Sequence, residues 1–195
     1  MDNPPPILPY APAERFSPWP NVAYAAMAGF FSGLLAIGSF LLPFFSLFLP
    51  GLAFGIIVGS SIPRARHNGH KLVFQFALIS MVLHTAMALL LVAMATSGLL
   101  AQLAIVAGVS MVQVWLGASI AGARALLYSV LVGTIAGPLC VLPSLFAPNA
   151  ASNNAAYYFL ILFMSIVAWH TTTAAAIGFS QTPGENAFTR NPPFA

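Results

Sequence analysis

The feature that most constrains this chain is a series of apolar runs, each about 20 residues long, between residues 22 and 178. At a rise of about 1.5 Å per residue, a helix of that length crosses a hydrocarbon layer about 30 Å thick. Charged residues make up only 5% of the 195 residues, against about 25% in soluble domains, and cannot cover a water-facing surface. The sequence therefore predicts an all-α, polytopic transmembrane helix bundle whose first partner is the lipid bilayer.

Two polar tails flank this apolar region. The first carries prolines at positions 4, 5, 6, 9, 12, 18 and 20, which disfavour a helix and favour an extended chain. Asp2 and Glu14 near the start argue against a cleavable signal peptide, so we expect the first apolar segment to remain in the protein. We expect residues 1–20 to form a disordered cytoplasmic tail, residues 21–179 the transmembrane domain, and residues 180–195 a short polar cytoplasmic tail.

Run length divides the apolar region into about six spans. They are expected at Val22–Leu42, Phe44–Ile62, Leu72–Ala95, Leu99–Ala121, Ala125–Phe146 and Ala156–Gly178. Pro43 and Pro50 leave open whether the first two are full spans or one kinked or re-entrant segment, which would reduce the count to about five.

The few basic residues favour six spans over five. They are Arg15, Arg64, Arg66, Lys71, Arg124 and Arg190. With six spans all of them fall on one side of the membrane, and the opposite connections carry no charge, which is the positive-inside pattern. We therefore interpret Arg64, Arg66, Lys71 and Arg124 as topogenic residues and expect both termini in the cytoplasm, in a bacterial inner membrane.

Glycines at four-residue spacing place small stripes on several spans. They are Gly29 and Gly33 in the first span, Gly51, Gly55 and Gly59 in the second, and Gly133 and Gly137 in the fifth. Such stripes let neighbouring backbones approach closely. We expect the first two spans to pack on each other as an antiparallel pair, and a stripe could also contact another membrane-protein subunit.

The segment PGLAFGIIVGSSIPRARHNGHKLVFQFALISMV, residues 50–82, combines a glycine-patterned helix, a basic turn and a second helix, and MDNPPPILPYAP precedes it at the N-terminus. This arrangement resembles uncharacterised small bacterial membrane proteins with a Pro-rich N-terminal tail and a Gly-patterned helical hairpin. The resemblance implies a helical hairpin and implies no activity.

The sequence has no Asp or Glu between Glu14 and Glu185, so no carboxylate is available within the membrane for catalysis or ion coupling. His84 and His170 fall at similar depth on different spans. Two such imidazoles could ligate a haem b iron axially, form interhelical hydrogen bonds, or line a solute or proton path. No metal site is expected, because His67 and His70 lack further ligands nearby.

These observations favour a non-enzymatic scaffold, anchor or accessory subunit of a membrane complex. One alternative is a haem-binding electron-transfer subunit that uses His84 and His170. Another is a small uncoupled channel or transporter, in which Gln75, Gln113 and Arg124 would line a shallow polar vestibule. Nucleic acid is not an expected partner, because the net charge of +3 is explained by topology.

Overall fold

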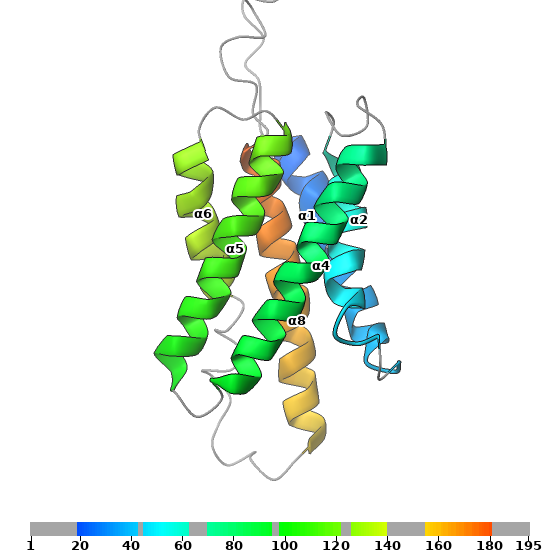
Figure 1. Ribbon diagram of the computed structural model, residues 1–195, viewed down its shortest axis with the longest axis vertical. Helices are drawn as coiled ribbons and strands as arrows, with labels where there is room; N and C mark the ends of the chain where they lie inside the picture. The colour runs from blue at the N-terminus through cyan, green and yellow to red at the C-terminus, as the bar shows by residue number, and fades with distance from the viewer. Residues whose placement is uncertain are drawn as a thin grey trace, which may run out of the picture.

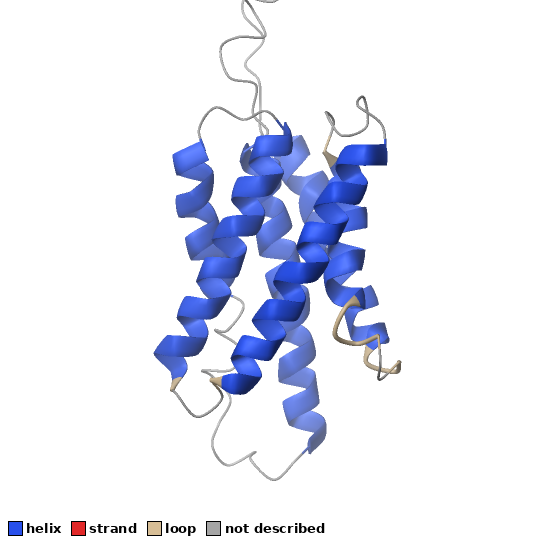
Figure 2. Cartoon of the chain, viewed as in Figure 1, coloured by secondary structure: helices blue, strands red, loops and turns tan. Residues whose placement is uncertain are grey.

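The computed structural model describes residues 19–42, 45–62, 70–94, 98–121, 126–139 and 155–180. Every regular element in these residues is a helix (Figure 2), as the sequence predicts. The six helices are α1 (Trp19–Ser39), α2 (Leu49–Ser61), α4 (His70–Ala93), α5 (Leu99–Ala121), α6 (Leu126–Leu139) and α8 (Ala155–Ser180). The expected disordered tails lie outside the described residues except at their inner ends, where Trp19 and Pro20 begin α1 and Ser180 ends α8, so the expected boundaries are wrong by one or two residues.

Four helices are long and apolar enough to cross a membrane, so the chain has the features of a multi-pass membrane protein. The candidate spans are Trp19–Ser39, His70–Ala93, Leu100–Ile120 and Leu160–Ser180. The 13 residues of α2 extend about 20 Å, which is less than the hydrocarbon thickness. The 14 described residues of α6 are similarly short. Six full spans therefore stay a prediction.

A turn, and not a continuous helix, separates α1 from α2. The amide N–H groups of Phe48 and Leu49 both donate to the carbonyl of Phe45, at 3.0 and 2.9 Å. Pro50 then occupies the first turn of α2, where its missing N–H has no helical partner to lose. Pro43 lies outside the described residues, so its own contribution to this turn stays a prediction.

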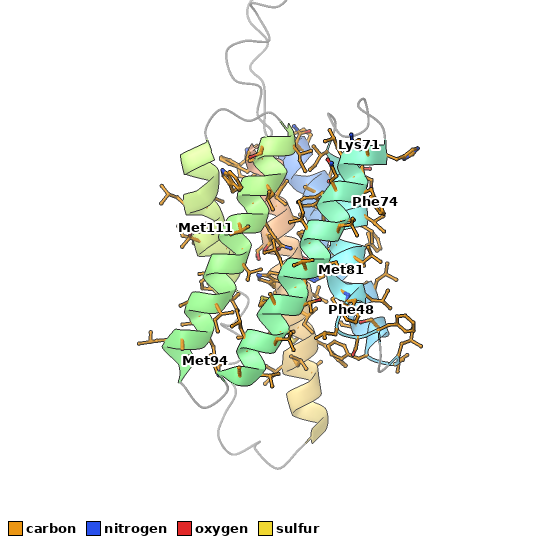
Figure 3. All side chains as sticks on the ribbon, viewed as in Figure 1. Phe48, Lys71, Phe74, Met81, Met94 and Met111 are labelled. Atoms are coloured by element: carbon orange, nitrogen blue, oxygen red, sulfur yellow. The ribbon has the colours of Figure 1, made fainter. Side chains whose placement is uncertain are left out.

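The helices alternate in direction along the chain, and α1 begins at the end of the bundle where α8 finishes (Figure 1). A Cβ on Gly178 would meet the backbone oxygen of Asn21 at 2.6 Å and the Cβ of Ala25 at 2.7 Å, which places these two helix ends side by side. Lys71 lies at that same end, and Met94 at the opposite end (Figure 3). The other topogenic residues, Arg64, Arg66 and Arg124, lie outside the described residues, and membrane sidedness stays a prediction.

Glycines mark the closest helix contacts, and they join α1 to α8 and α2 to α4. On α1, a Cβ at Gly33 would fall 2.8 Å from the Cα of Val167 in α8, and one at Gly29 would overlap the carbonyl oxygen of His170. On α2, Gly51, Gly55 and Gly59 all face α4. The expected antiparallel contact between α1 and α2 is present (Figure 1), but it is not made through the two glycine stripes, since each of these helices uses its glycines against another helix.

The stripe on α6 serves a third helix pair. A Cβ at Gly133 would fall 2.9 Å from the Cβ of Val114 in α5, and one at Gly137 would fall 2.8 Å from the Cβ of Ser110. Small residues thus bring α6 against α5, α2 against α4, and α1 against α8. Close backbone approach of this kind is how helices associate in lipid, where apolar surface alone gives no preference for protein over acyl chains.

Both the outer surface and the core of the bundle are apolar. Val92 and Leu100 are 77% and 82% exposed, and Phe74 projects away from the bundle at 61% exposure (Figure 3). Inside, Phe54, Phe76 and Ile177 belong to one buried cluster. An apolar exterior over the long helices fits hydrocarbon as the surrounding solvent.

Candidate functional site

Four aromatic rings from three helices meet in the interior, and we call them the ring cluster: Phe54 of α2, His84 of α4, and Trp169 and His170 of α8. The ring centroid of His84 lies 5.2 Å from that of His170 and 4.6 Å from that of Trp169. Phe54 lies 5.5 Å from His84 and 5.1 Å from His170. All four residues are at most 4% exposed. The two histidines singled out in the sequence are therefore neighbours.

Helical periodicity and the glycines together assemble this cluster. Phe76, Ser80 and His84 recur every four residues and lie, with Ala77, on the buried face of α4. Gly51 allows α2 to approach that face, since a Cβ there would fall 2.8 Å from the Cβ of His84. Phe54, three residues further along α2, then reaches the histidine rings.

His84 is held by its own helix and by α5. Its Nδ1 lies 2.8 Å from the carbonyl oxygen of Ser80 and 3.0 Å from the side-chain amide of Gln113. Gln113 is fully buried, whereas Gln75 is exposed on α4. The structure therefore does not bring these two glutamines together in the expected vestibule, because Gln113 faces inward as a partner of His84.

His170 is held by α1. Its Nδ1 lies 2.8 Å from the hydroxyl oxygen of Ser32, and that hydroxyl lies 2.8 Å from the carbonyl oxygen of Gly29. The contact is possible because Gly29 brings the backbone of α1 against the carbonyl of His170. The neighbouring Trp169 donates its indole N–H to the hydroxyl of Ser110 in α5, at 2.6 Å. Hydrogen bonds thus fix both histidines and the tryptophan.

Several buried polar atoms near this region have no hydrogen-bond partner among the described residues. They are Ser80 Oγ, His84 Nε2, Gln113 Oε1 and Thr173 Oγ1. Leaving a buried polar atom unpaired costs about 1–3 kcal/mol, so natural structures usually satisfy such atoms with protein, water or ligand. His84 Nε2 is the most informative of the four, because the same residue also lines a cavity.

A cavity of about 260 Å³ adjoins the ring cluster. Its wall is formed by residues of the α1–α2 turn and of α2, α4 and α8: Phe40, Ser46, Leu47, Pro50, His84, Met87, Ala88, Leu91, Leu162, Ile166, Trp169 and His170. Apolar side chains make up most of this wall, which also includes both histidines. A mostly apolar hollow with a few placed polar groups is the usual form of a small-molecule site.

The ring cluster does not fit a haem held between His84 and His170. An iron bound axially by two imidazoles needs its nitrogens about 2 Å away on opposite faces of a porphyrin. Here the rings stand edge to face at 80°, and Phe54 and Trp169 pack within 5.5 Å of both. Among the described residues, moreover, no group of three or more His, Cys, Asp or Glu side chains is placed to hold a metal ion.

The sequence indicated the two histidines and Trp169, which directly precedes His170, but not Phe54 or Ser32. Phe54 and Ser32 carry no pattern that distinguishes them from other apolar or small residues in the spans. The one available signal was positional, because Ser32 and Phe54 each lie three residues after a glycine of a stripe and so share its helix face.

No protein-family model, no curated protein and no solved structure matches this chain. The resemblance to small bacterial membrane proteins stays a prediction, and the interpretation of the site depends on its geometry alone.

Proposed function

We propose that this protein is a six-span integral membrane protein that binds an apolar, membrane-soluble molecule in the cavity beside His84 and His170. The observation that supports this proposal is the cavity of about 260 Å³, whose largely apolar wall contains a buried histidine with an unpartnered nitrogen. Hydrogen bonds to Ser80 and Ser32 hold the two imidazoles in place, so the site is formed before a ligand arrives.

The size of the cavity suits a small ring system. A cavity of about 150 Å³ lined by apolar side chains stays dry and binds benzene. The present one is larger, at about 260 Å³, and so has room for a substituted or two-ring body. Trp169 and Phe40 add aromatic surface against which a flat ligand can pack.

Binding without chemistry is the activity that the residues favour. The sequence offers no carboxylate between Glu14 and Glu185 to act as a general acid or base, and each histidine already has one nitrogen engaged. A non-enzymatic component that holds a membrane-soluble molecule is compatible with an accessory subunit of a larger complex.

Filling the cavity should abolish binding. Ala88 lines the cavity on α4, whereas Ala86 on the same helix is exposed on the outside. We expect the protein in lipid nanodiscs to retain 1-naphthol saturably above empty nanodiscs in equilibrium dialysis. Ala88→Phe should reduce this retention at least tenfold, and Ala86→Phe should leave it unchanged.

Retention that is equal in Ala88→Phe and Ala86→Phe would place the bound naphthol outside the cavity. Retention that never saturates would mean simple partition into lipid, and the proposed function would be wrong.

We further propose that both termini are cytoplasmic, which the positions of the six basic residues support. The test uses single cysteines at Asn68 and Ser97 in a Cys140→Ser background. An impermeant maleimide applied to intact cells should label Ser97→Cys, and Asn68→Cys should react only after the membrane is opened. Labelling of both from the same side would contradict six spans.

A further inference from the structure

We propose that the molecule bound in the cavity carries a hydroxyl group, an alcohol or a phenol, that donates a hydrogen bond to Nε2 of His84. The inference rests on the proposed function and names the ligand class of the same site. It follows from the positions of the protons on the two imidazole rings, which their partners determine.

His84 carries its ring proton on Nδ1. The 2.8 Å contact from this nitrogen is made to the carbonyl oxygen of Ser80, which can only accept a hydrogen bond. An unprotonated Nδ1 would place two lone pairs against each other at that distance. A neutral imidazole has one ring proton, so Nε2 of His84 is left with a lone pair and no donor among the described residues.

The amide of Gln113 agrees with this assignment once its two ends are exchanged. Its nitrogen is placed 3.0 Å from Nδ1 of His84, and its oxygen Oε1 has no partner among the described residues. The two ends have nearly the same shape, so the hydrogen-bond network decides between them. With the oxygen toward His84, the Nδ1–H donates to two acceptors, and the amide NH2 takes the position at which no partner lies among the described residues.

The same logic applies to His170. The hydroxyl of Ser32 has one proton, which it donates to the carbonyl oxygen of Gly29 at 2.8 Å. The 2.8 Å contact between that hydroxyl and Nδ1 of His170 therefore takes its proton from the ring. In the neutral ring, Nε2 of His170 is again an acceptor.

Two acceptor nitrogens thus belong to residues that line one apolar cavity. A ketone, ester or ether oxygen would present a lone pair to another lone pair and stay unpaired, which is costly in a buried site. A hydroxyl supplies the missing proton. Apart from Ser46 and the indole N–H of Trp169, which is bonded to Ser110, the remaining wall, with Leu47, Met87 and Leu91, offers apolar contact to the rest of the ligand.

Matched probes test directly whether the site accepts a hydrogen bond from its ligand. We expect the unmodified protein in nanodiscs to bind 1-naphthol about tenfold more tightly than 1-methoxynaphthalene or 1-naphthaldehyde, as one buried hydrogen bond allows. Each value is measured by equilibrium dialysis against empty nanodiscs, which removes the difference in lipid partition. Farnesol and its methyl ether, used as competitors, report whether a lipid alcohol is preferred to a soluble phenol.

A matched variant separates the hydrogen bond from the cavity. His84→Phe keeps a ring and removes the acceptor, so 1-naphthol binding should fall about tenfold and 1-methoxynaphthalene binding should remain. Survival of ether binding also shows that the variant folds. If it does not fold, the three probes on the unmodified protein decide the matter alone.

Equal or tighter binding of the ether or the aldehyde by the unmodified protein would overturn the inference while leaving a binding cavity in place. If no probe binds saturably, the proposed function itself is wrong. The two failures are therefore distinguishable in one assay.

Discussion

Gly55→Ala is expected to lower the midpoint of thermal unfolding in detergent by several degrees. The new Cβ would overlap the Cα of Ala77 in α4 and fall 2.9 Å from its backbone nitrogen. Backbone atoms cannot rotate away as a side chain can, so α2 and α4 would have to separate. Overpacking of this kind costs about 1–3 kcal/mol, and a backbone obstacle places the cost at the upper end. The midpoint of unfolding is measured from the loss of helical circular dichroism on heating.

Gly108→Ala is the matched control for this prediction. Gly108 lies within α5, and a Cβ added there meets no atom within 4 Å. Alanine is favoured over glycine in a helix by about 0.8–1.0 kcal/mol, so this variant should melt at the same temperature or higher. If Gly55→Ala is as stable as Gly108→Ala, then α2 and α4 do not make the close contact described.

The long helices were predictable because lipid leaves little choice of structure. An apolar run of about 20 residues must satisfy its backbone hydrogen bonds internally, so run length fixes the element. The expected Leu99–Ala121 coincides with α5, and the expected Leu72–Ala95 differs from α4 (His70–Ala93) by two residues at each end. The shorter α2 and α6 were less predictable, because apolarity continues through turns and prolines as readily as through helix.

The contact between α1 and α2 was predicted and is present, but the partner of each glycine stripe was not predictable, since a small residue shows that a backbone comes close but not which one. Gly29 and Gly55 belong to similar stripes, yet one meets α8 and the other meets α4. For the same reason, the sequence did not show whether His84 and His170 are adjacent. Depth along the helices could be counted from the sequence, whereas the rotation of each helix depends on the packing of all its neighbours. The sequence therefore did not indicate that Phe54 belongs to the site, because this depends on where α2 packs.

Phe54→Ala is expected to be the most destabilising single truncation within the ring cluster. The Phe54 ring is fully buried and contacts rings from two other helices, at 5.1 Å for His170, 5.5 Å for His84 and 6.3 Å for Phe76. Helices in lipid are held by packing, and removing this ring deletes its dispersion contacts and leaves a void among groups that are fixed by hydrogen bonds. Truncation of a buried phenylalanine costs about 3–5 kcal/mol.

The control is Phe30→Ala, which removes the same atoms from a residue of α1 that is 43% exposed on the outside of the bundle. Lipid replaces the contacts of that ring, so its unfolding midpoint should stay close to that of the unmodified protein. Trp169 stacks near Phe54, with ring centroids 6.2 Å apart, so its fluorescence should change in Phe54→Ala and not in Phe30→Ala. Equal stability and equal emission in the two variants would mean that Phe54 faces lipid, and the ring cluster with its cavity would then have to be abandoned.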